Sequence, residues 1–481
     1  MVGHFSSHPD ADPSRIVIKP KLRVPAPRPE QVVRLRLLEL LGNNSDYKTT
    51  LISAPAGYGK TTLLAQWRLE EAGPPFAWVS LDEQDNDPIR LWRHIVEALH
   101  RVSPQEDFGV DVLGGMSISG RRLIELSLPM LINGLAELPC RVVVVLDDYH
   151  FIAEEECHES VAFFVEHLPA NVHLVLSSRT DPPLALGRWR ARGELNEIRT
   201  QQLAFSDEEA AYLLNENMRL EIVPDDISVL QERTEGWPAA IYLAALSLHN
   251  REDRHAFIAS FGGSNRYIVD LLGEEVLASL PCEVREFLLK TSVLRRMTGS
   301  LCDAVAGRER SGRLLRELAR ANLFVVPLDE KGDWYRYHTL FSDLLLYELK
   351  SCWPELAPLL HGRASVWLEE AGLFESAVRH AIAAEDYERA GMLVTHHWQR
   401  YVLAGQMATV KGWLAALPEE LTTHDAALLL VRAWISILSG RREESGRYLA
   451  LAERIPYEGP LSDGTASIEA GAATVKAVFG L

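Results

Sequence analysis

Apolar residues in the first 205 positions alternate between short unbroken runs and longer segments with helical spacing. The runs are rich in β-branched residues and are bounded by turn-forming or polar positions, which is typical of parallel strands buried on both faces. They occupy residues 49–53, 76–81, 141–147 and 172–177, and a final strand near residues 194–199 would complete the sheet. Helical spacing is found between them at residues 60–71, 88–101 and 121–138. The alternation predicts an α/β fold with a parallel sheet of about five strands.

From Ser206 onward the apolar period is helical. Ser206 and Glu209 have the spacing of a capping box and predict the start of a helix. Further helices are expected at residues 225–234, 283–299 and 312–323. Two β-prone runs, at 324–328 and 334–341, flank a polar turn, and helices followed by a hairpin predict a winged helix.

Residues 351–481 show only short amphipathic segments joined by glycine-containing turns. This pattern predicts an arm of paired helices similar to tetratricopeptide repeats, with a period of roughly 34 to 40 residues. Small residues dominate positions 464–481, and we expect the helical array to fray or to be cut short there.

These changes of pattern predict five consecutive parts, because 481 residues are too many for one hydrophobic core. They are a loose tail at 1–20, an α/β nucleotide-binding domain at 21–205, a helical lid at 206–280, a winged helix at 281–350 and a helical arm at 351–481.

Composition excludes several classes of protein. The formal charge of −18 argues against nucleic acid binding along the whole chain, and the basic cluster at 188–192 is interpreted as a solvated face or a partner of nearby acids. The five scattered cysteines include no C-x-x-C pair, so neither a disulfide framework nor a zinc site is indicated. No apolar run is long enough to span a membrane and the N-terminus lacks the order of a signal peptide, so we expect a cytoplasmic protein.

A glycine-containing loop joins the first predicted strand to the first predicted helix. It matches the phosphate-binding pattern G-x-x-x-x-G-K-[ST], except that alanine replaces the first glycine. The glycines let backbone N–H groups face an anion, the lysine is expected to reach the β- and γ-phosphates, and the following threonine is expected to bind Mg²⁺. The alternative is a glycine-rich turn without a ligand. The candidate residues are Ala54, Pro55, Ala56, Gly57, Tyr58, Gly59, Lys60, Thr61 and Thr62.

Two consecutive carboxylates end the strand at 141–147. Asp147 is expected to hold the Mg²⁺ shell, because ligands of open α/β sheets lie at the carboxyl ends of the strands. Asp148 is placed to orient or deprotonate an attacking water. The alternative for Asp148 is a helix cap or a surface acid.

Other single residues remain ambiguous on pattern alone. Arg179, after the strand at 172–177, is either a γ-phosphate contact or an exposed loop residue. An amphipathic helix that includes Val32 and Arg34 either covers an adenine or only packs. Pro238 belongs to a rigid Gly-Trp-Pro turn that could close over a base or sugar, and His338 is most simply a core or capping histidine.

Seven motifs, taken in order, resemble the MalT-like transcriptional activators, which belong to the signal-transduction ATPases with numerous domains (STAND). The motifs lie at residues 53–62, 80–83, 145–150, 176–179, 201–205, 236–238 and 337–341, and the resemblance extends over about residues 20–455. It implies a LuxR-type regulatory switch that binds ATP or ADP with Mg²⁺. ADP would hold a closed resting state, ATP with an inducer would open it and allow self-association, and slow ATP hydrolysis would reset it.

The resemblance also assigns roles that the pattern leaves open. It implies that Arg179 senses the γ-phosphate, that Pro238 packs on the nucleotide and that His338 contacts the β-phosphate of ADP. Val32 and Arg34 would lie beside the adenine. By the same resemblance, Lys60 and Thr61 would hold the phosphates and Mg²⁺, Asp147 the metal shell, and Asp148 would promote hydrolysis.

One departure concerns DNA. Full-length relatives carry a longer helical sensor and a LuxR-type helix-turn-helix, and neither is evident after residue 453, so DNA binding is expected only through a domain that this sequence does not contain. The inducer, a small molecule or a protein, is not indicated. The competing hypotheses are a stand-alone P-loop ATPase or phosphotransferase, and a helical interaction protein with a vestigial nucleotide site.

Overall fold

The computed structural model describes residues 17–26, 31–42, 47–69, 73–105, 108–109, 111–112, 123–249, 251, 253–404, 406–457, 459–461 and 464–479. Most of the predicted tail at 1–20, and the end of the helix predicted at 60–71, lie outside them. The chain forms two compact units. The first holds Met1–Ala278, Glu317–Val325 and His338–Leu340, and the second holds Ser279–Arg316, Val326–Tyr337 and Phe341–Leu481.

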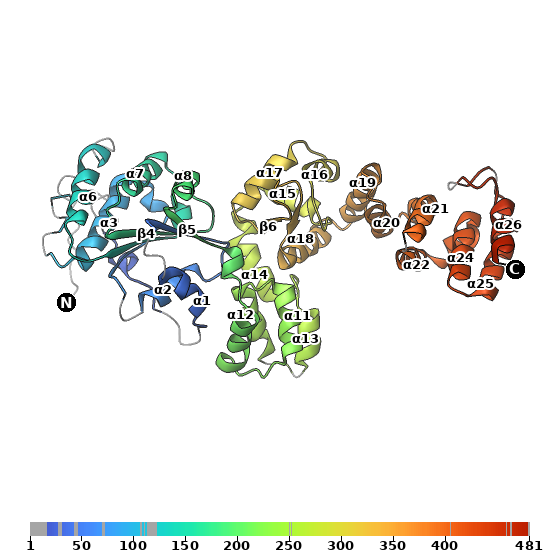
Figure 1. Ribbon diagram of the computed structural model, residues 1–481, viewed down its shortest axis with the longest axis horizontal. Helices are drawn as coiled ribbons and strands as arrows, with labels where there is room; N and C mark the ends of the chain where they lie inside the picture. The colour runs from blue at the N-terminus through green and yellow to red at the C-terminus, as the bar shows by residue number, and fades with distance from the viewer. Residues whose placement is uncertain are drawn as a thin grey trace, which may run out of the picture. The chain divides into compact units, whose positions relative to one another are not determined.

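A five-stranded parallel sheet forms the centre of the first unit, as predicted (Figure 1). Its strands lie in the order β2-β3-β4-β1-β5. Their bounds are β1 Thr49–Ser53, β2 Phe76–Ser80, β3 Val142–Asp147, β4 Val172–Ser178 and β5 Leu195–Arg199. Because the strands are parallel, Ser53 is in register with Ser178, and Ser80 with Asp147, so their polar ends share one edge of the sheet.

Helices pack their apolar residues against this sheet and form one large hydrophobic core with it. The helices are α3 Pro88–Val102, α6 Leu128–Ala136, α7 Glu155–Glu166 and α8 Leu186–Ala191. The helix predicted at 121–138 begins, within the described residues, with a π-helical turn at Leu123–Ser127 that continues directly into α6. Helix α2, Lys60–Arg68, follows the glycine loop directly.

The helix predicted to include Val32 and Arg34 begins after both of these residues, so its predicted first residue was wrong. Helix α1 spans Leu35–Gly42, and the Arg34 carbonyl accepts from the first helical N–H groups, those of Leu37 at 2.9 Å and Leu38 at 3.0 Å. The Val32 carbonyl accepts from the side-chain amide of Gln66 at 2.9 Å instead of from a helical N–H. Arg34 is therefore the residue that immediately precedes the first turn of α1, and Val32 lies before it.

Helices complete the first unit after β5. They are α9 Thr200–Leu203, α10 Asp207–Ala211, α11 Pro224–Thr234, α12 Pro238–Leu248, α13 Arg254–Ser260 and α14 Arg266–Glu275. The predicted capping box is confirmed, because the Ser206 hydroxyl accepts from the N–H of Glu209 at 3.2 Å and the Glu209 carboxylate accepts from the N–H of Ser206 at 3.1 Å. Helices α13 and α14 were not predicted.

A winged helix follows, with a two-stranded sheet of β6 Val325–Pro327 and β7 Tyr335–Tyr337. The helix predicted at 283–299 ends instead at Thr291, and Met297 in the following segment forms an antiparallel bridge with Tyr335. The β-run predicted to reach residue 341 ends at Tyr337. The helices are α15 Cys282–Thr291, α16 Gly299–Ala306, α17 Ser311–Arg320 and α18 Thr339–Cys352.

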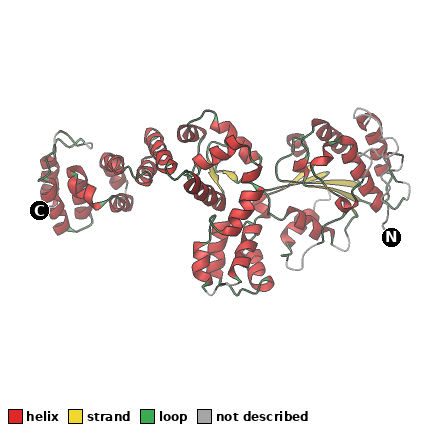
Figure 2. Ribbon diagram, turned by 180° about the vertical axis from the view of Figure 1, so that it is seen from behind, coloured by secondary structure: helices red, strands yellow, loops and turns green. Residues whose placement is uncertain are grey.

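The remaining described chain is helical (Figure 2), and helices that are adjacent in sequence contact each other, for example α19 with α20 and α24 with α25. The bounds are α19 Leu356–Glu370, α20 Phe374–Ala383, α21 Tyr387–Leu403, α22 Met407–Ala416, α23 Glu419–His424, α24 Ala426–Leu438, α25 Arg442–Ala452 and α26 Ile468–Phe479. The expected fraying after residue 464 was wrong, because α26 buries Ile468, Ala472 and Val475 in a core shared with α24.

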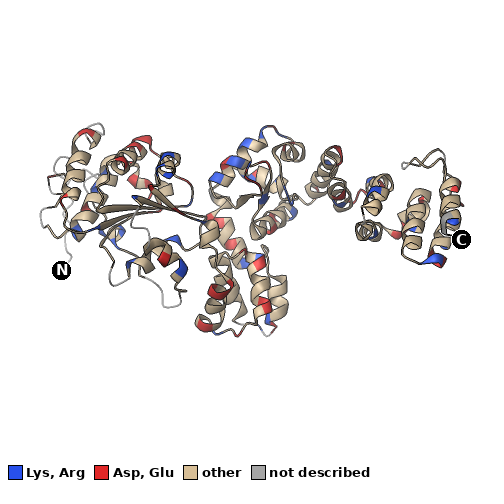
Figure 3. Cartoon of the chain, viewed as in Figure 1, with Lys and Arg blue, Asp and Glu red and all other residues tan. Residues whose placement is uncertain are grey.

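Charged residues of both signs are interspersed over the described elements of each unit (Figure 3). Among the described residues, no helix has the combination of length and apolar composition that crossing a bilayer requires.

Candidate functional site

The glycine loop presents Lys60 at the carboxyl end of β1. Gly57 and Gly59 have φ angles of 78° and 77°, a left-handed conformation that costs glycine little. The Lys60 ammonium is buried and donates to the carbonyls of Ala54 at 2.8 Å and Pro55 at 3.0 Å. Burial lowers the pKa of Lys60 to about 8, although the negative charge of Asp148 opposes the shift. The amine therefore lies inside the loop, where it can move to a bound anion.

Thr61 and Asp147 meet directly, as their predicted shared role requires. The Thr61 hydroxyl donates to Oδ2 of Asp147 at 2.8 Å. The other carboxylate oxygen, Oδ1, is buried and has no hydrogen-bond partner among the described residues. Burial raises the pKa of Asp147. A hydroxyl and a carboxylate with an unused oxygen are the oxygen ligands that Mg²⁺ prefers, so these two residues fit the metal.

Asp148 follows at the tip of the strand and adopts a left-handed conformation, with φ of 59°. Its carboxylate is 38% exposed, whereas Asp147 is fully buried. Burial and the neighbouring charge of Asp147 raise the pKa of Asp148 to about 6. The two acids thus differ, one enclosed beside Thr61 and one accessible to solvent with a pKa close to neutrality.

Arg179 lies after β4, and its charge acts on both Lys60 and Asp148. Its guanidinium donates to Oε2 of Glu275, on α14, at 3.1 Å. The structure therefore brings Lys60, Asp147, Asp148 and Arg179 together at one edge of the sheet.

A cavity of about 520 Å³ adjoins the loop. Several predicted residues line it, namely Val32, Arg34, Gly57, Gly59, Thr62 and Pro238. Phe205, Leu213 and Tyr242 add apolar and aromatic walls. This volume and this mixture of apolar walls with a few polar groups are typical of small-molecule sites.

Trp237 holds the loop from the side of α12 and was not among the predicted site residues. Its indole N–H donates to the Ala56 carbonyl at 3.0 Å, and its ring stacks on Tyr58 with centroids 6.4 Å apart. The Ala239 N–H donates to the Gly57 carbonyl at 3.1 Å. A Cβ at Gly57 would lie 2.6 Å from the Ala239 methyl, so this close approach requires glycine. The signal in the sequence was the rigid Gly-Trp-Pro turn.

His338 is buried on the far side of this tryptophan. Its ring lies 6.0 Å from that of Trp237 and 5.6 Å from that of Phe324, both in edge-on geometry, and it is not among the described residues that line the cavity. The structure therefore relates His338 to the loop through Trp237. Contact with a phosphate stays a prediction.

Asn322 and Thr339 lie in the winged-helix part of the sequence but belong to the first compact unit. Each of them contacts residues elsewhere in that unit. The Asn322 amide donates to the Ser53 hydroxyl and to the Arg179 carbonyl, each at 3.0 Å. Oε1 of Glu235 accepts from both the N–H and the hydroxyl of Thr339 at 2.7 Å. Neither contact could be predicted from the local sequence, because each joins residues that are more than 100 positions apart.

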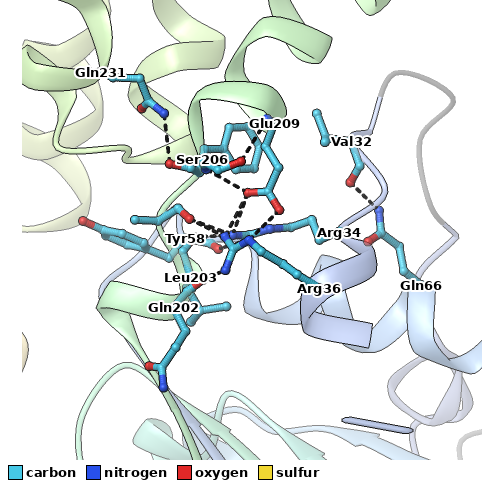
Figure 4. A network of polar contacts seen from close by, with 12 residues as sticks. Val32, Arg34, Arg36, Tyr58, Gln66, Gln202, Leu203, Ser206, Glu209 and Gln231 are labelled. Carbon is cyan, nitrogen blue, oxygen red and sulfur yellow. Dashed lines mark hydrogen bonds and ion pairs between the residues drawn. The ribbon is translucent and has the colours of Figure 1, made fainter. Parts of the chain in front are cut away.

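Arg34 is the centre of a buried polar network (Figure 4). Its guanidinium donates to the Leu203 carbonyl at 2.7 Å and the Ala204 carbonyl at 3.1 Å, and pairs with Glu209 at 3.4 Å. Arg36 pairs with the same carboxylate at 2.9 Å from a more exposed position. Burial lowers the pKa of Arg34 to about 10, so it remains charged at neutral pH. Arg34 thus joins the loop, the cavity and the start of α10.

The parallel sheet with its glycine loop defines the P-loop nucleoside triphosphatase fold, here combined with a winged helix and helical pairs. Residues 273–357 match the MalT winged helix domain. The HTH-type transcriptional regulator MalT of Serratia proteamaculans is 33% identical over 453 residues, which are 91% of this chain and 48% of that protein. The predicted resemblance to MalT-like regulators is thereby confirmed.

Two further proteins are also similar to this chain. The serine/threonine-protein kinase PknK of Mycobacterium tuberculosis is 34% identical over 425 residues, covering 88% of this chain and 38% of the kinase. A STAND protein with a tetratricopeptide repeat sensor from Pyrococcus horikoshii has a TM-score of 0.36 and 15% identity, over 90% of this chain and 65% of that one. The chain spans about half or less of the length of the curated relatives named here.

Proposed function

We propose that this chain is a nucleotide-controlled regulatory module, in which ATP or ADP governs how the winged-helix segment is held. The observation that carries the proposal is the bond from Thr61 to Asp147 beside the buried ammonium of Lys60. A P-loop enzyme needs this trio for Mg²⁺ and the terminal phosphates. The similarity to MalT over 91% of the chain supports regulation as the purpose.

The adjoining cavity would receive the nucleoside. Val32 and Pro238 offer apolar contacts for a base, and Arg34 forms the inner polar wall. The phosphates would then follow Gly57 and Gly59 toward Lys60. Thr61 and Asp147 would hold Mg²⁺, which neutralises phosphate charge when bound.

Contacts of the winged-helix segment would make the response depend on the nucleotide. Asn322 contacts the residue that precedes the loop and the carbonyl of Arg179, while His338 packs on the tryptophan that holds Ala56. A ligand shifts a conformational equilibrium only through unequal affinity for the two states. We propose that ADP is compatible with these contacts and favours the closed state, whereas ATP with an inducer favours release and self-association.

Mass spectrometry of the nucleotide released from the purified protein tests this function. Co-purified ADP at close to one equivalent is the expected result. A protein that contains no nucleotide and also fails to bind a fluorescent ADP analogue would contradict the proposal. Rapid, inducer-independent turnover with a small phosphate acceptor would instead support a phosphotransferase.

The pH dependence of hydrolysis is a prediction about Asp148. If its carboxylate accepts a proton from water, the rate at saturating ATP should rise with pH and level off above about 7, because the pKa of Asp148 is raised to about 6 and only the ionised form is a base. We expect Asp148→Asn to lower the rate by roughly a hundredfold and to remove the inflection. Phosphate release measured from pH 5 to 8 checks this, and a flat wild-type profile would remove Asp148 from the mechanism.

Retention of ADP is a prediction about the winged-helix contacts. We expect His338→Ala and Asn322→Ala each to accelerate ADP release by roughly tenfold, since each removes contacts of about 1 kcal/mol or more from the closed state. Stopped-flow release of a fluorescent ADP analogue measures the effect. Lys331→Ala, an exposed position in the β6–β7 turn, is the matched control and should release ADP at the wild-type rate. Unchanged release in both test variants would contradict the proposed coupling.

A further inference from the structure

A second cavity, of about 730 Å³, lies within the second unit. Its walls come from the loop after α15, helix α16, the turn of the β6–β7 hairpin, and helices α19 and α20 with the loop between them. All of these residues are remote in sequence from the nucleotide loop, and none belongs to the first unit. The cavity has the volume of a site for a small organic molecule.

Three arginines converge on this cavity, namely Arg295, Arg296 and Arg379. Arg379 donates to the Ser376 hydroxyl at 2.9 Å, and within the described part of the chain none of the three guanidinium groups has a carboxylate within ion-pair distance. Burial lowers the pKa of Arg379, and the charges of Arg295 and Arg296 lower it further, against the opposing effect of Glu375. The mutual repulsion of these cations is therefore only partly compensated in the protein itself.

The other carboxylate of the cavity is already engaged. Oδ1 of Asp329 accepts from the N–H of Asp333 and Oδ2 accepts from the N–H of Trp334, both at 2.9 Å. These bonds shape the hairpin turn, and the pKa of Asp329 is lowered by its backbone hydrogen bonds. Because both carboxylate oxygens of Asp329 accept hydrogen bonds within the turn, Glu375 is the carboxylate of the cavity wall that remains to balance the charge of the arginines.

Apolar side chains form the rest of the wall. Trp334 presents an aromatic ring from the hairpin, and Leu294, Leu301, Leu368 and Leu373 come from the loop and helices. An aromatic face next to arginines suits a planar anionic compound, because guanidinium groups hydrogen-bond carboxylates or phosphates in a bidentate manner and also stack on aromatic surfaces.

We propose that this cavity binds a small organic anion, with a carboxylate or phosphate held by Arg295, Arg296 and Arg379 and an apolar, planar body against Trp334. Its occupant would contact both the winged-helix hairpin and the first helical pair of the arm. The assignment does not depend on the proposed nucleotide function, because it shares no residue with the glycine loop.

Two aromatic probes distinguish the anionic groups. 4-Nitrophenyl phosphate and 4-nitrobenzoate are titrated into the full chain, with uncharged 4-nitroanisole as the reference, and binding is measured by calorimetry. At least one anion should bind, and 4-nitroanisole should bind at least tenfold more weakly. The stronger anion identifies phosphate or carboxylate as the preferred group. Failure of both anions to bind would overturn the proposal.

Variants assign the binding to this cavity. Arg295→Gln, Arg296→Gln and Arg379→Gln should each weaken binding by roughly tenfold, since each removes a charge-assisted hydrogen bond. Arg442→Gln, an exposed arginine of α25, is the matched control and should bind like the wild type. Lys60→Ala should also retain binding, which separates this cavity from the nucleotide loop. If all three cavity variants bind the anion as tightly as the wild type and unfold at the same temperature, the assignment is overturned. Loss of anion binding in Lys60→Ala would also overturn it.

Discussion

Lys60→Ala is expected to lower the affinity for ADP by roughly a hundredfold, because it removes charge-assisted hydrogen bonds together worth about 3 kcal/mol. The Lys60 ammonium is now shared between the carbonyls of Ala54 and Pro55, from which it would transfer to the phosphates. Its removal also takes away a positive charge that acts on both Asp147 and Asp148. Equilibrium titration with a fluorescent ADP analogue gives the dissociation constants.

The matched control for Lys60→Ala is Lys48→Ala. Lys48 directly precedes strand β1, which leads into the glycine loop. Lys48 is partly exposed and pairs with Glu194 at 3.0 Å, so its loss should leave ADP affinity within about twofold of the wild type. Because the pKa of Lys60 is lowered to about 8, affinity of the wild type should also decline as the pH rises above that value. Equal affinities of Lys60→Ala and the wild type would contradict the assignment of the loop.

Arg34→Met is expected to lower the free energy of unfolding by about 3 to 5 kcal/mol, the usual cost of removing one member of a buried ion pair. The variant would leave Glu209 without its buried partner and would remove the donors to the carbonyls of Leu203 and Ala204. Urea unfolding, monitored through the transition of the first unit, measures this loss.

Arg36→Met is the matched control for the network, because it changes the other arginine bound to Glu209. The Arg36 side chain is 40% exposed, whereas that of Arg34 is 4% exposed. An exposed ion pair contributes at most about 1 kcal/mol, so this control should be much less destabilising. If Arg34→Met lowers the free energy of unfolding no more than Arg36→Met does, the burial of Arg34 adds little to stability.

The sheet could be predicted from the sequence because its signals are local. Strands β2, β3 and β4 consist mainly of apolar residues, and the Val142–Asp147 run ends in the carboxylate that the loop requires. The pairing of Thr61 with Asp147 fits the expectation that ligands of a parallel sheet lie at the carboxyl ends of its strands. The same is true of the capping box at Ser206, whose two partners lie three residues apart.

The remaining features depend on partners that are distant in the chain. Arg34 precedes the first turn of α1, and its guanidinium donates to carbonyls 169 and 170 residues away. Trp237 reaches Ala56 across 181 residues, and Met297, beyond the end of the helix predicted at 283–299, pairs with Tyr335. A local hydrophobic period contains no information about such partners, so a helix start, a loop-holding tryptophan and a helix end were all missed.

The tryptophan that contacts the glycine loop also makes the loop optically visible. Trp237 is 1% exposed and lies between Tyr58 and Phe324, so its indole should emit at short wavelength as long as it donates to Ala56. If α12 leaves the loop, water will reach the ring and the emission will shift to the red. The difference between the spectra of the wild type and Trp237→Phe isolates this signal from the other ten tryptophans of the chain, eleven in all. The protein therefore carries a built-in fluorophore for following the loop in real time, without a dye.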